Sequence, residues 1–205
     1  MTRLAIAINL DRCVGCHTCA IACKVQNNIP EGILWNRILT QNCDVTDGAE
    51  GTYPDVTRTY LPVACQHCQN AACLRACPTG ATYLDDKGRV EIDYDKCIGC
   101  RMCMAACPYN ARSFNWQEPV RVTGANYGDV AVPERHKGVA EKCTLCKERT
   151  DQGEEPMCVV CCPAHARIYG DLDDPNSEIS KVVRDRNAWT LLEEQGTRPS
   201  IHYFD

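Results

Sequence analysis

The sequence is poor in large aromatic side chains, in positive charge and in long hydrophobic runs. Only two phenylalanines and three tryptophans occur among 205 residues, and the formal net charge is −5. A nucleic-acid-binding surface calls for a basic face, and a membrane-spanning helix needs about 18 or more consecutive apolar residues. The sequence therefore predicts no nucleic-acid partner and no transmembrane segment. Any attachment to a membrane would depend on other subunits.

The first residues, MTRLAIAINLDRC, hold a short apolar stretch without a small-residue cleavage site before the first cysteines. This pattern predicts a β-strand and not a secretory signal peptide.

Cysteine, by contrast, is abundant: there are 18, close to the proportion that marks a cysteine-built scaffold. A domain with a small apolar core needs disulfides or metals to hold it. Disulfide frameworks usually separate their partners, whereas Cys13, Cys16 and Cys19 recur every third residue. Structural zinc sites use two C-x2-C pairs around one ion, and a third and fourth cysteine exceed that need. The spacing argues against both.

The spacing C-x2-C-x2-C-x3-C-P is typical of bacterial [4Fe–4S] sites. A tight loop can reach three iron corners of a cubane with thiolates. The fourth cysteine starts a segment that leads away, and in proteins with two clusters it binds the other cluster. A repeated run of this kind predicts several iron–sulfur clusters.

The run occurs four times, with two extra residues before the third cysteine of motif two and an eleven-residue insert, KERTDQGEEPM, in motif four. The four motifs are Cys13, Cys16, Cys19 and Cys23; Cys65, Cys68, Cys73 and Cys77; Cys97, Cys100, Cys103 and Cys107; and Cys143, Cys146, Cys158 and Cys162. The flanking residues repeat too: CPTGATY, CPYNARSF and CPAHARIY share Cys-Pro and an alanine four residues after the cysteine. Such self-similarity indicates duplicated units, each a strand, a cysteine loop, a short helix, Cys-Pro and a strand. Residues 83–92, YLDDKGRVEI, predict a hairpin between two units.

Motifs two and three are close together in the chain, so motifs one and four are expected to pair around them. The fold class predicted is α+β, with two nested ferredoxin-like modules. One module comprises residues 1–60 with 141–172 and the other residues 61–114; residues 115–140 form an insertion loop and residues 173–205 a tail that contacts partner subunits.

Exchange of the fourth ligand within each pair predicts four [4Fe–4S] sites. Their ligands are Cys13, Cys16, Cys19 and Cys162 (site I); Cys65, Cys68, Cys73 and Cys107 (site II); Cys97, Cys100, Cys103 and Cys77 (site III); and Cys143, Cys146, Cys158 and Cys23 (site IV).

Cys161 lies beside Cys162, and either could be the ligand. Cys162 precedes Pro163 and keeps the regular spacing, which favours it. Cys43 stands alone and is predicted to be an ordinary thiol.

Lys24 replaces the usual proline after Cys23, and AIACKVQ predicts a helix that proline would interrupt.

Histidines 17, 67 and 165 lie in or beside cysteine motifs. Rieske sites use histidine in place of cysteine, but no cysteine is missing here. These histidines are therefore expected to lie near the clusters or at the surface, where hydrogen bonds can tune potentials. Clusters with four cysteine ligands have no open coordination position, so the predicted chemistry is one-electron transfer, and the metal-free chain is expected to be largely unfolded.

The sequence resembles the four-cluster electron-transfer subunits of molybdopterin oxidoreductases, such as dimethyl sulfoxide, polysulfide and respiratory arsenate reductases. The resemblance covers nearly the whole chain, including YLPVACQHCQNAACLRACPTGA, DKCIGCRMCMAACPYNAR, EKCTLCKER and the tail GDLDDPNSEISKVV … EQGTRPSIHYF. Some relatives lack one cysteine of motif three and hold a three-iron cluster. Cys100 is present here, so four cubanes are expected.

The resemblance also implies pseudo-twofold symmetry between the modules, a catalytic partner with a molybdenum or tungsten bis-pterin, and a quinol-oxidising membrane subunit. Export with a signal-bearing catalytic subunit would place the complex on the extracytoplasmic face; a cytoplasmic location is the alternative. Other interpretations are the corresponding subunit of a formate dehydrogenase or hydrogenase, or a free-standing polyferredoxin. The substrate is a property of the catalytic partner.

Overall fold

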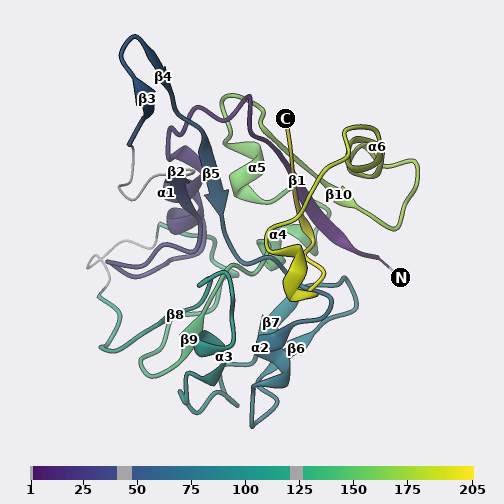
Figure 1. Cartoon of the computed structure of the whole chain (residues 1–205). Coiled ribbons are helices and arrows are strands. Elements are labelled where there is room, and N and C mark those ends of the chain that lie inside the picture. The colour runs from purple at the N-terminus through teal and green to yellow at the C-terminus, as the bar shows by residue number, and fades with distance from the viewer. Residues whose placement is uncertain (1, 41–47, 121–126) are drawn as a thin grey trace.

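The computed structural model describes residues 2–40, 48–120 and 127–205 as a mixed α/β fold of short helices and small sheets. Two lobes are visible in Figure 1, with helix α4 (Lys147–Thr150) between them. We call them the sheet lobe and the hairpin lobe. The described part of the chain contains no helix long and apolar enough to span a bilayer.

The sheet lobe is organised around strand β1 (Leu4–Asn9), which confirms the strand predicted at the N-terminus. β1 lies between β10 (Arg167–Asp171), which is antiparallel to it, and β11 (Ile201–Phe204), which is parallel to it. The lobe also contains α1 (Thr18–Gln26), β2 (Arg37–Thr40), β3 (Glu50–Thr52), β4 (Asp55–Thr57), β5 (Tyr60–Val63), α5 (Met157–Val160) and α6 (Glu178–Asp185).

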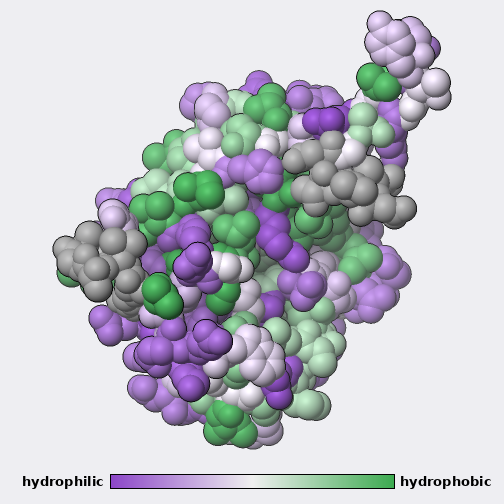
Figure 2. Space-filling model, turned by 90° about the vertical axis from the view of Figure 1, so that its left-hand side faces the viewer, coloured by the Kyte–Doolittle hydropathy of each residue, from purple (hydrophilic) through white to green (hydrophobic). Residues whose placement is uncertain are grey.

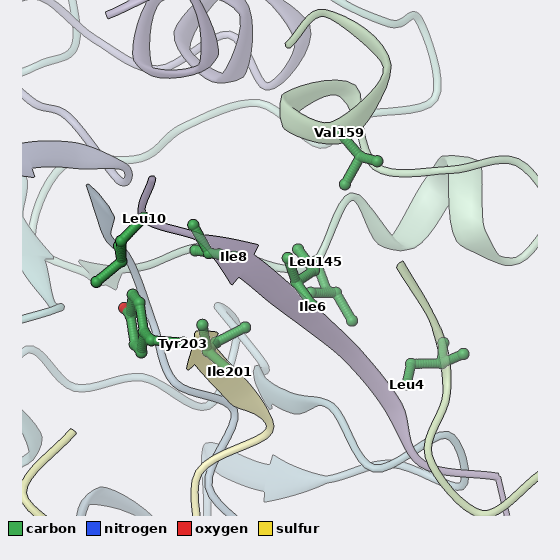
Figure 3. Close-up of a cluster of buried hydrophobic side chains, with 8 residues drawn as sticks. All are labelled: Leu4, Ile6, Ile8, Leu10, Leu145, Val159, Ile201 and Tyr203. Atoms are coloured by element: carbon green, nitrogen blue, oxygen red, sulfur yellow. The ribbon is translucent and has the colours of Figure 1, made fainter. Parts of the chain in front are cut away.

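Both faces of β1 are buried, because successive side chains of a strand point to opposite faces. On one face, alternate residues form a core with apolar side chains from three other segments (Figure 3). This core consists of Leu4, Ile6, Ile8, Leu10, Leu145, Val159, Ile201 and Tyr203. On the other face, Ala5 and Ala7 pack against Ile179 of α6 and Phe204.

The C-terminal residues, predicted to contact partner subunits, also build this core. The side chain of Tyr203 is fully buried, and its hydroxyl donates a hydrogen bond to the carbonyl oxygen of Pro62 at 2.8 Å. A short 3-10 helix, Glu193–Gln195, precedes β11. Contact of residues 173–205 with a partner stays a prediction.

The hairpin lobe holds two strand pairs and two one-turn helices. Strands β6 (Thr82–Leu84) and β7 (Val90–Ile92) form the predicted hairpin. Strands β8 (Ser113–Phe114) and β9 (Ala140–Glu141) form the second pair. Helices α2 (Ala72–Arg75) and α3 (Met102–Ala105) pack against each other, as α1 packs against α5. The predicted order of strand, cysteine loop, helix and strand is therefore confirmed in β5–α2–β6 and β7–α3–β8.

A buried arginine joins the two lobes. Arg89, directly before β7, donates hydrogen bonds to Asp85 at 2.7 Å, to the Thr150 hydroxyl at 2.7 Å and to Asp151 at 2.8 Å. Asp151 follows α4 directly, so this network ties the hairpin turn to motif four.

Two further segments lie outside the strands and helices of the two lobes: a projecting hairpin and the predicted insertion loop. The β3–β4 hairpin projects from it (Figures 1 and 2) and exposes Tyr53 at its tip. In the predicted insertion loop, residues 121–126 lie outside the described residues. Its described part includes the buried side chains Val132 and Arg135.

Candidate metal centres

Three of the four predicted cysteine sets each line a cavity of their own. The cysteines around these cavities are Cys13, Cys16, Cys19 and Cys162 for the first, Cys77, Cys97, Cys100 and Cys103 for the second, and Cys23, Cys143, Cys146 and Cys158, together with Cys65 of predicted site II, for the third. Each cavity joins three thiols of one motif to the fourth thiol of another. These are the sets that the sequence groups as sites I, III and IV.

The fourth set gathers around Cys68. Burial, together with the neighbouring thiols Cys65, Cys73 and Cys107, raises the pKa of this thiol to about 12. These residues are the predicted site II. All four predicted sets are therefore brought together in space, although their members are up to 149 positions apart in sequence.

The thiols surround cavities and do not converge on one point. Every described cysteine is a free thiol. Over the same residues, no three His, Cys, Asp or Glu side chains are arranged to hold a single metal ion. The geometry matches a group large enough to present several metal atoms to separate ligands.

The cysteine loops share one backbone feature that keeps them tight. The residue before the second cysteine has positive φ in each motif: 66° at Gly15, 42° at His67, 68° at Gly99 and 55° at Leu145. A Cβ atom on Gly15 would lie 2.3 Å from the Tyr60 ring, so a side chain cannot fit there. His67 and Leu145 adopt the same conformation despite a cost of roughly 1–2 kcal/mol for an L-residue. The sequence signal, V/I-Gly-Cys, is visible only in motifs one and three.

The three motif histidines lie in this kind of backbone. His17, His67 and His165 all have positive φ. The His67 ring is fully buried, and its Nδ1 accepts a hydrogen bond from the Val90 backbone N–H at 3.1 Å. Burial, with the nearby charge of Lys142, holds the pKa of His67 well below its usual value, so the ring is neutral. His67 therefore contributes a loop conformation and a backbone contact.

Backbone donors point at several sulfur atoms. The N–H groups of Leu145, Ala166 and Thr82 donate to the sulfurs of Cys143 at 3.3 Å, Cys162 at 3.4 Å and Cys77 at 3.5 Å, respectively. Burial raises the pKa of Cys77, but hydrogen bonds, first among them that from Thr82, outweigh it and lower this pKa to about 7. Hydrogen bonds to sulfur favour the thiolate, which is the form that binds metal.

Three buried cations lie among these cysteines. The side chains of Arg112, Lys142 and Arg167 are buried, and none forms an ion pair with a carboxylate in the described part of the chain. Arg112 donates to the Cys73 sulfur at 3.1 Å, and Arg167 donates to the Cys19 sulfur at 3.4 Å. A buried charge without a partner is costly. Thiolates and buried cations together fit a net-negative iron–sulfur group.

The leftover thiols differ in position. Cys162 lines the cavity of site I, whereas Cys161, the C-cap residue of α5, is not among the lining residues. Cys43 lies outside the described residues.

Lys24 continues α1, which ends at Gln26, and its ammonium group donates to the Ile33 carbonyl oxygen at 2.9 Å. The helix predicted at AIACKVQ is thus confirmed.

Comparison with known proteins decides the family. Residues 56–124 and 122–172 match the 4Fe-4S dicluster domain, and residues 10–26 match a 4Fe-4S binding domain. The chain belongs to the 4Fe-4S dicluster family. It therefore binds iron–sulfur clusters, as the cysteine spacing predicts.

Relatives of this dicluster protein are subunits of oxidoreductases. The chain is 52% identical, over all of its length and 80% of the relative, to a candidate iron–sulfur subunit of dimethyl sulfoxide reductase from Halobacterium salinarum. It is 40% identical, over 98% of its length and 95% of the relative, to the arsenate respiratory reductase iron–sulfur subunit of a Shewanella species. It is 37% identical to a sulfite dehydrogenase subunit of Allochromatium vinosum, over 99% of its length and 83% of the relative. The predicted relationship to iron–sulfur subunits of molybdopterin oxidoreductases is confirmed.

The four cysteine sets of the dicluster protein follow one another in space. Cys103 of site III and Cys73 of site II are electrostatic neighbours, as are Cys143 of site IV and Cys65 of site II. Cys158 of site IV and Cys19 of site I form the third neighbouring pair. The spatial order is therefore III, II, IV, I. Among the described cysteines, only Cys16 of site I and Cys100 of site III are exposed, and these sites are the two ends.

Proposed function

We propose that the chain holds four [4Fe–4S] clusters in the order III, II, IV, I and relays single electrons along them. The observation that carries this proposal is the row of four cysteine sets with an exposed thiol at each end and neighbouring thiols at each junction. Such clusters exchange one electron at a time without opening a coordination position. The sixteen predicted cysteines are the proposed ligands, in the four sets defined above.

Apolar residues, buried cations and backbone N–H groups around the cysteine sets determine the polarity of each cluster's environment. Ile6, Ile8 and Leu145 line the cavity of site IV together with Pro62. These apolar groups exclude water, which lowers the local dielectric constant and strengthens the effect of nearby charges and hydrogen bonds. The buried cations and backbone N–H groups then stabilise the thiolates. Differences among these surroundings give each cluster its own reduction potential.

Two ends of the row suggest two redox partners. Beside Cys16, the side chains of Val14, Ile21 and Val25 are exposed, and an open hollow runs along this face of α1. Apolar patches are visible between polar side chains on the face in Figure 2. At the other end, Ile98 and Met102 flank Cys100 and are 67% and 55% exposed. Exposed apolar surface of this kind marks protein contacts.

We assign these ends to a molybdopterin catalytic subunit and to a quinol-linked membrane subunit or another electron donor. The complex would associate with the membrane through these partners, on the extracytoplasmic face after co-export or, alternatively, in the cytoplasm. A formate dehydrogenase or hydrogenase subunit would use the same relay.

Nested modules with pseudo-twofold symmetry are part of the proposal. The packing of α1 against α5 and of α2 against α3 supports the pairing of motif one with four and of two with three. Residues 1–60 with 141–172 would form one module, residues 61–114 the other, with residues 115–140 inserted and residues 173–205 facing a partner.

The test is anaerobic purification followed by iron and sulfide analysis. We expect about sixteen irons per chain, four for each cluster; fewer than about twelve would contradict the four-cluster assignment. Cys162→Ser should lose one cluster signal in electron paramagnetic resonance spectra, whereas the matched control Cys161→Ser should keep all four. Loss in the Cys161 variant alone would reverse the ligand choice.

Purification under native conditions tests the partners. A molybdopterin protein should co-purify with the chain, and its substrate range would separate a reductase from a formate dehydrogenase or hydrogenase. A stable, fully loaded monomer without such a partner would favour a free-standing polyferredoxin.

A further inference from the structure

Two buried arginines occupy equivalent places in the two cluster pairs. Arg112 and Arg167 each stand five residues after the cysteine of a Cys-Pro pair, in CPYNAR and CPAHAR. Building on the proposed cluster assignment, we propose that each arginine is a shared positive charge between the two clusters of one module. In this position it raises the reduction potentials of both clusters.

Arg167 borders both cavities of its pair. Its side chain lines the cavity of site I and the cavity of site IV. Its Nη2 donates to the sulfur of Cys19, a site I thiol, at 3.4 Å. The same nitrogen donates to the Asn36 side-chain oxygen at 3.4 Å, which fixes the direction of the guanidinium. One buried cation therefore faces two proposed clusters.

Arg112 repeats this arrangement in the hairpin lobe. It lines the cavity of site III, while its Nη2 donates to the sulfur of Cys73, a site II thiol, at 3.1 Å. Its Nη1 donates to the hydroxyl of Thr82 at 3.2 Å. Thr82 is the residue five positions after Cys77, so it takes the arginine's place in motif two. The module thus carries one guanidinium and one acceptor that orients it.

The thiols that interact most strongly with these arginines are third cysteines of their motifs, and the first cysteines Cys13 and Cys65 are further neighbours. Cys19 and Cys158 lie near Arg167, and Cys73 and Cys103 lie near Arg112. Each arginine therefore has beside it one third cysteine from each of the two cysteine sets of its module. A single cation in this position acts on both sets.

The electrostatic consequence concerns the electron in transit. Each electron that enters a cluster adds one negative charge, comes from the preceding redox centre and requires no proton or new bond. Hydrogen bonds to sulfur and nearby positive charge raise the reduction potential of a cluster. No carboxylate in the described residues forms an ion pair with either arginine, so their positive charge is not neutralised in this way. Because the cation is shared, an electron that moves between the two clusters stays beside the same charge.

The test is a redox titration of the purified complex, followed by electron paramagnetic resonance. Arg167→Met should lower the reduction equilibrium constants of the clusters at sites I and IV by about tenfold or more, which is about 59 mV for one electron. Sites II and III should not change. Arg112→Met should give the reciprocal result, and Arg→Lys at either position should recover part of the shift. Arg186, which is exposed, supplies the control variant Arg186→Met.

Three outcomes separate the possibilities. Full iron content with unchanged potentials, or with a shift at only one cluster of the pair, would overturn the shared role. If Arg→Met variants lose clusters, Arg→Gln keeps donors to sulfur without the charge, and its potentials should still fall at both sites. A wild-type complex without four clusters would instead contradict the proposed function itself.

Discussion

The sheet lobe and the hairpin lobe surround similar cysteine loops but are held together differently. In the sheet lobe, two apolar clusters cover both faces of β1 (Figure 3). In the hairpin lobe, the apolar cluster around Tyr109 and Ala111 includes Cys65 and packs against further cysteines. The sheet lobe therefore has an apolar core around β1 in addition to the cluster that includes Cys23, whereas the core of the hairpin lobe consists largely of cluster ligands. Iron–sulfur clusters should matter more for folding in the hairpin lobe.

Iron removal should produce the largest difference in stability between the two lobes. Chelation of the anaerobic protein should abolish amide hydrogen-exchange protection in β6, β7, β8 and β9, because metal binding supplies their folding free energy. Part of the protection in β1 and β10 should survive, since apolar burial supports these strands, and this narrows the expectation of a largely unfolded metal-free chain to the hairpin lobe. Hydrogen exchange read by mass spectrometry gives both lobes in one experiment. Equal loss in the two lobes would show that the apolar core is insufficient on its own.

Arg89→Met should have the second largest effect, because it removes the hydrogen bonds that hold the β6–β7 hairpin to motif four. The change leaves Asp85 buried without its partner, and breaking a buried pair costs about 3–5 kcal/mol. Hydrogen exchange of the loaded protein should show faster opening of β6 and β7 and little change in β1. Arg184→Met, at the exposed Arg184–Asp185 pair, is the matched control, with an expected effect under about 1 kcal/mol. A uniform effect over both lobes would mean that they unfold as one unit.

Ile6→Val should have the smallest effect and should destabilise the sheet lobe alone. Ile6 is 3% exposed within the core of the sheet lobe, and loss of one buried methylene group costs about 1 kcal/mol. The opening free energy of β1 should fall by this amount, with the hairpin lobe unchanged. Val130→Ala, at a residue that is 91% exposed, should have an effect within about 0.5 kcal/mol. A larger change in the hairpin lobe than in β1 would contradict the division.

Much of the site follows from the sequence because the ligands of each loop are close along the chain. Cys97, Cys100 and Cys103 reach one cavity through a single turn, whatever surrounds them. The strand at the N-terminus, the hairpin around Gly88 and the helix through Lys24 also follow from local patterns. The place of the C-terminal residues does not: Ile201 pairs with Ile6, 195 positions away in the chain, and no local pattern specifies such a partner.

The chemistry of this protein can be recognised from its amino acids alone, because four cysteine runs with iron–sulfur spacing also indicate the family to which the chain belongs. Three features required the folded chain: the spatial order of the cysteine sets, the left-handed backbone at His67 and Leu145, and the position of Arg112 and Arg167 between sites. The physical reason is the separation along the chain between the residues that interact. Spacing within a loop is fixed by a few covalent bonds, whereas the neighbours of a buried charge are fixed by packing between segments far apart in the chain.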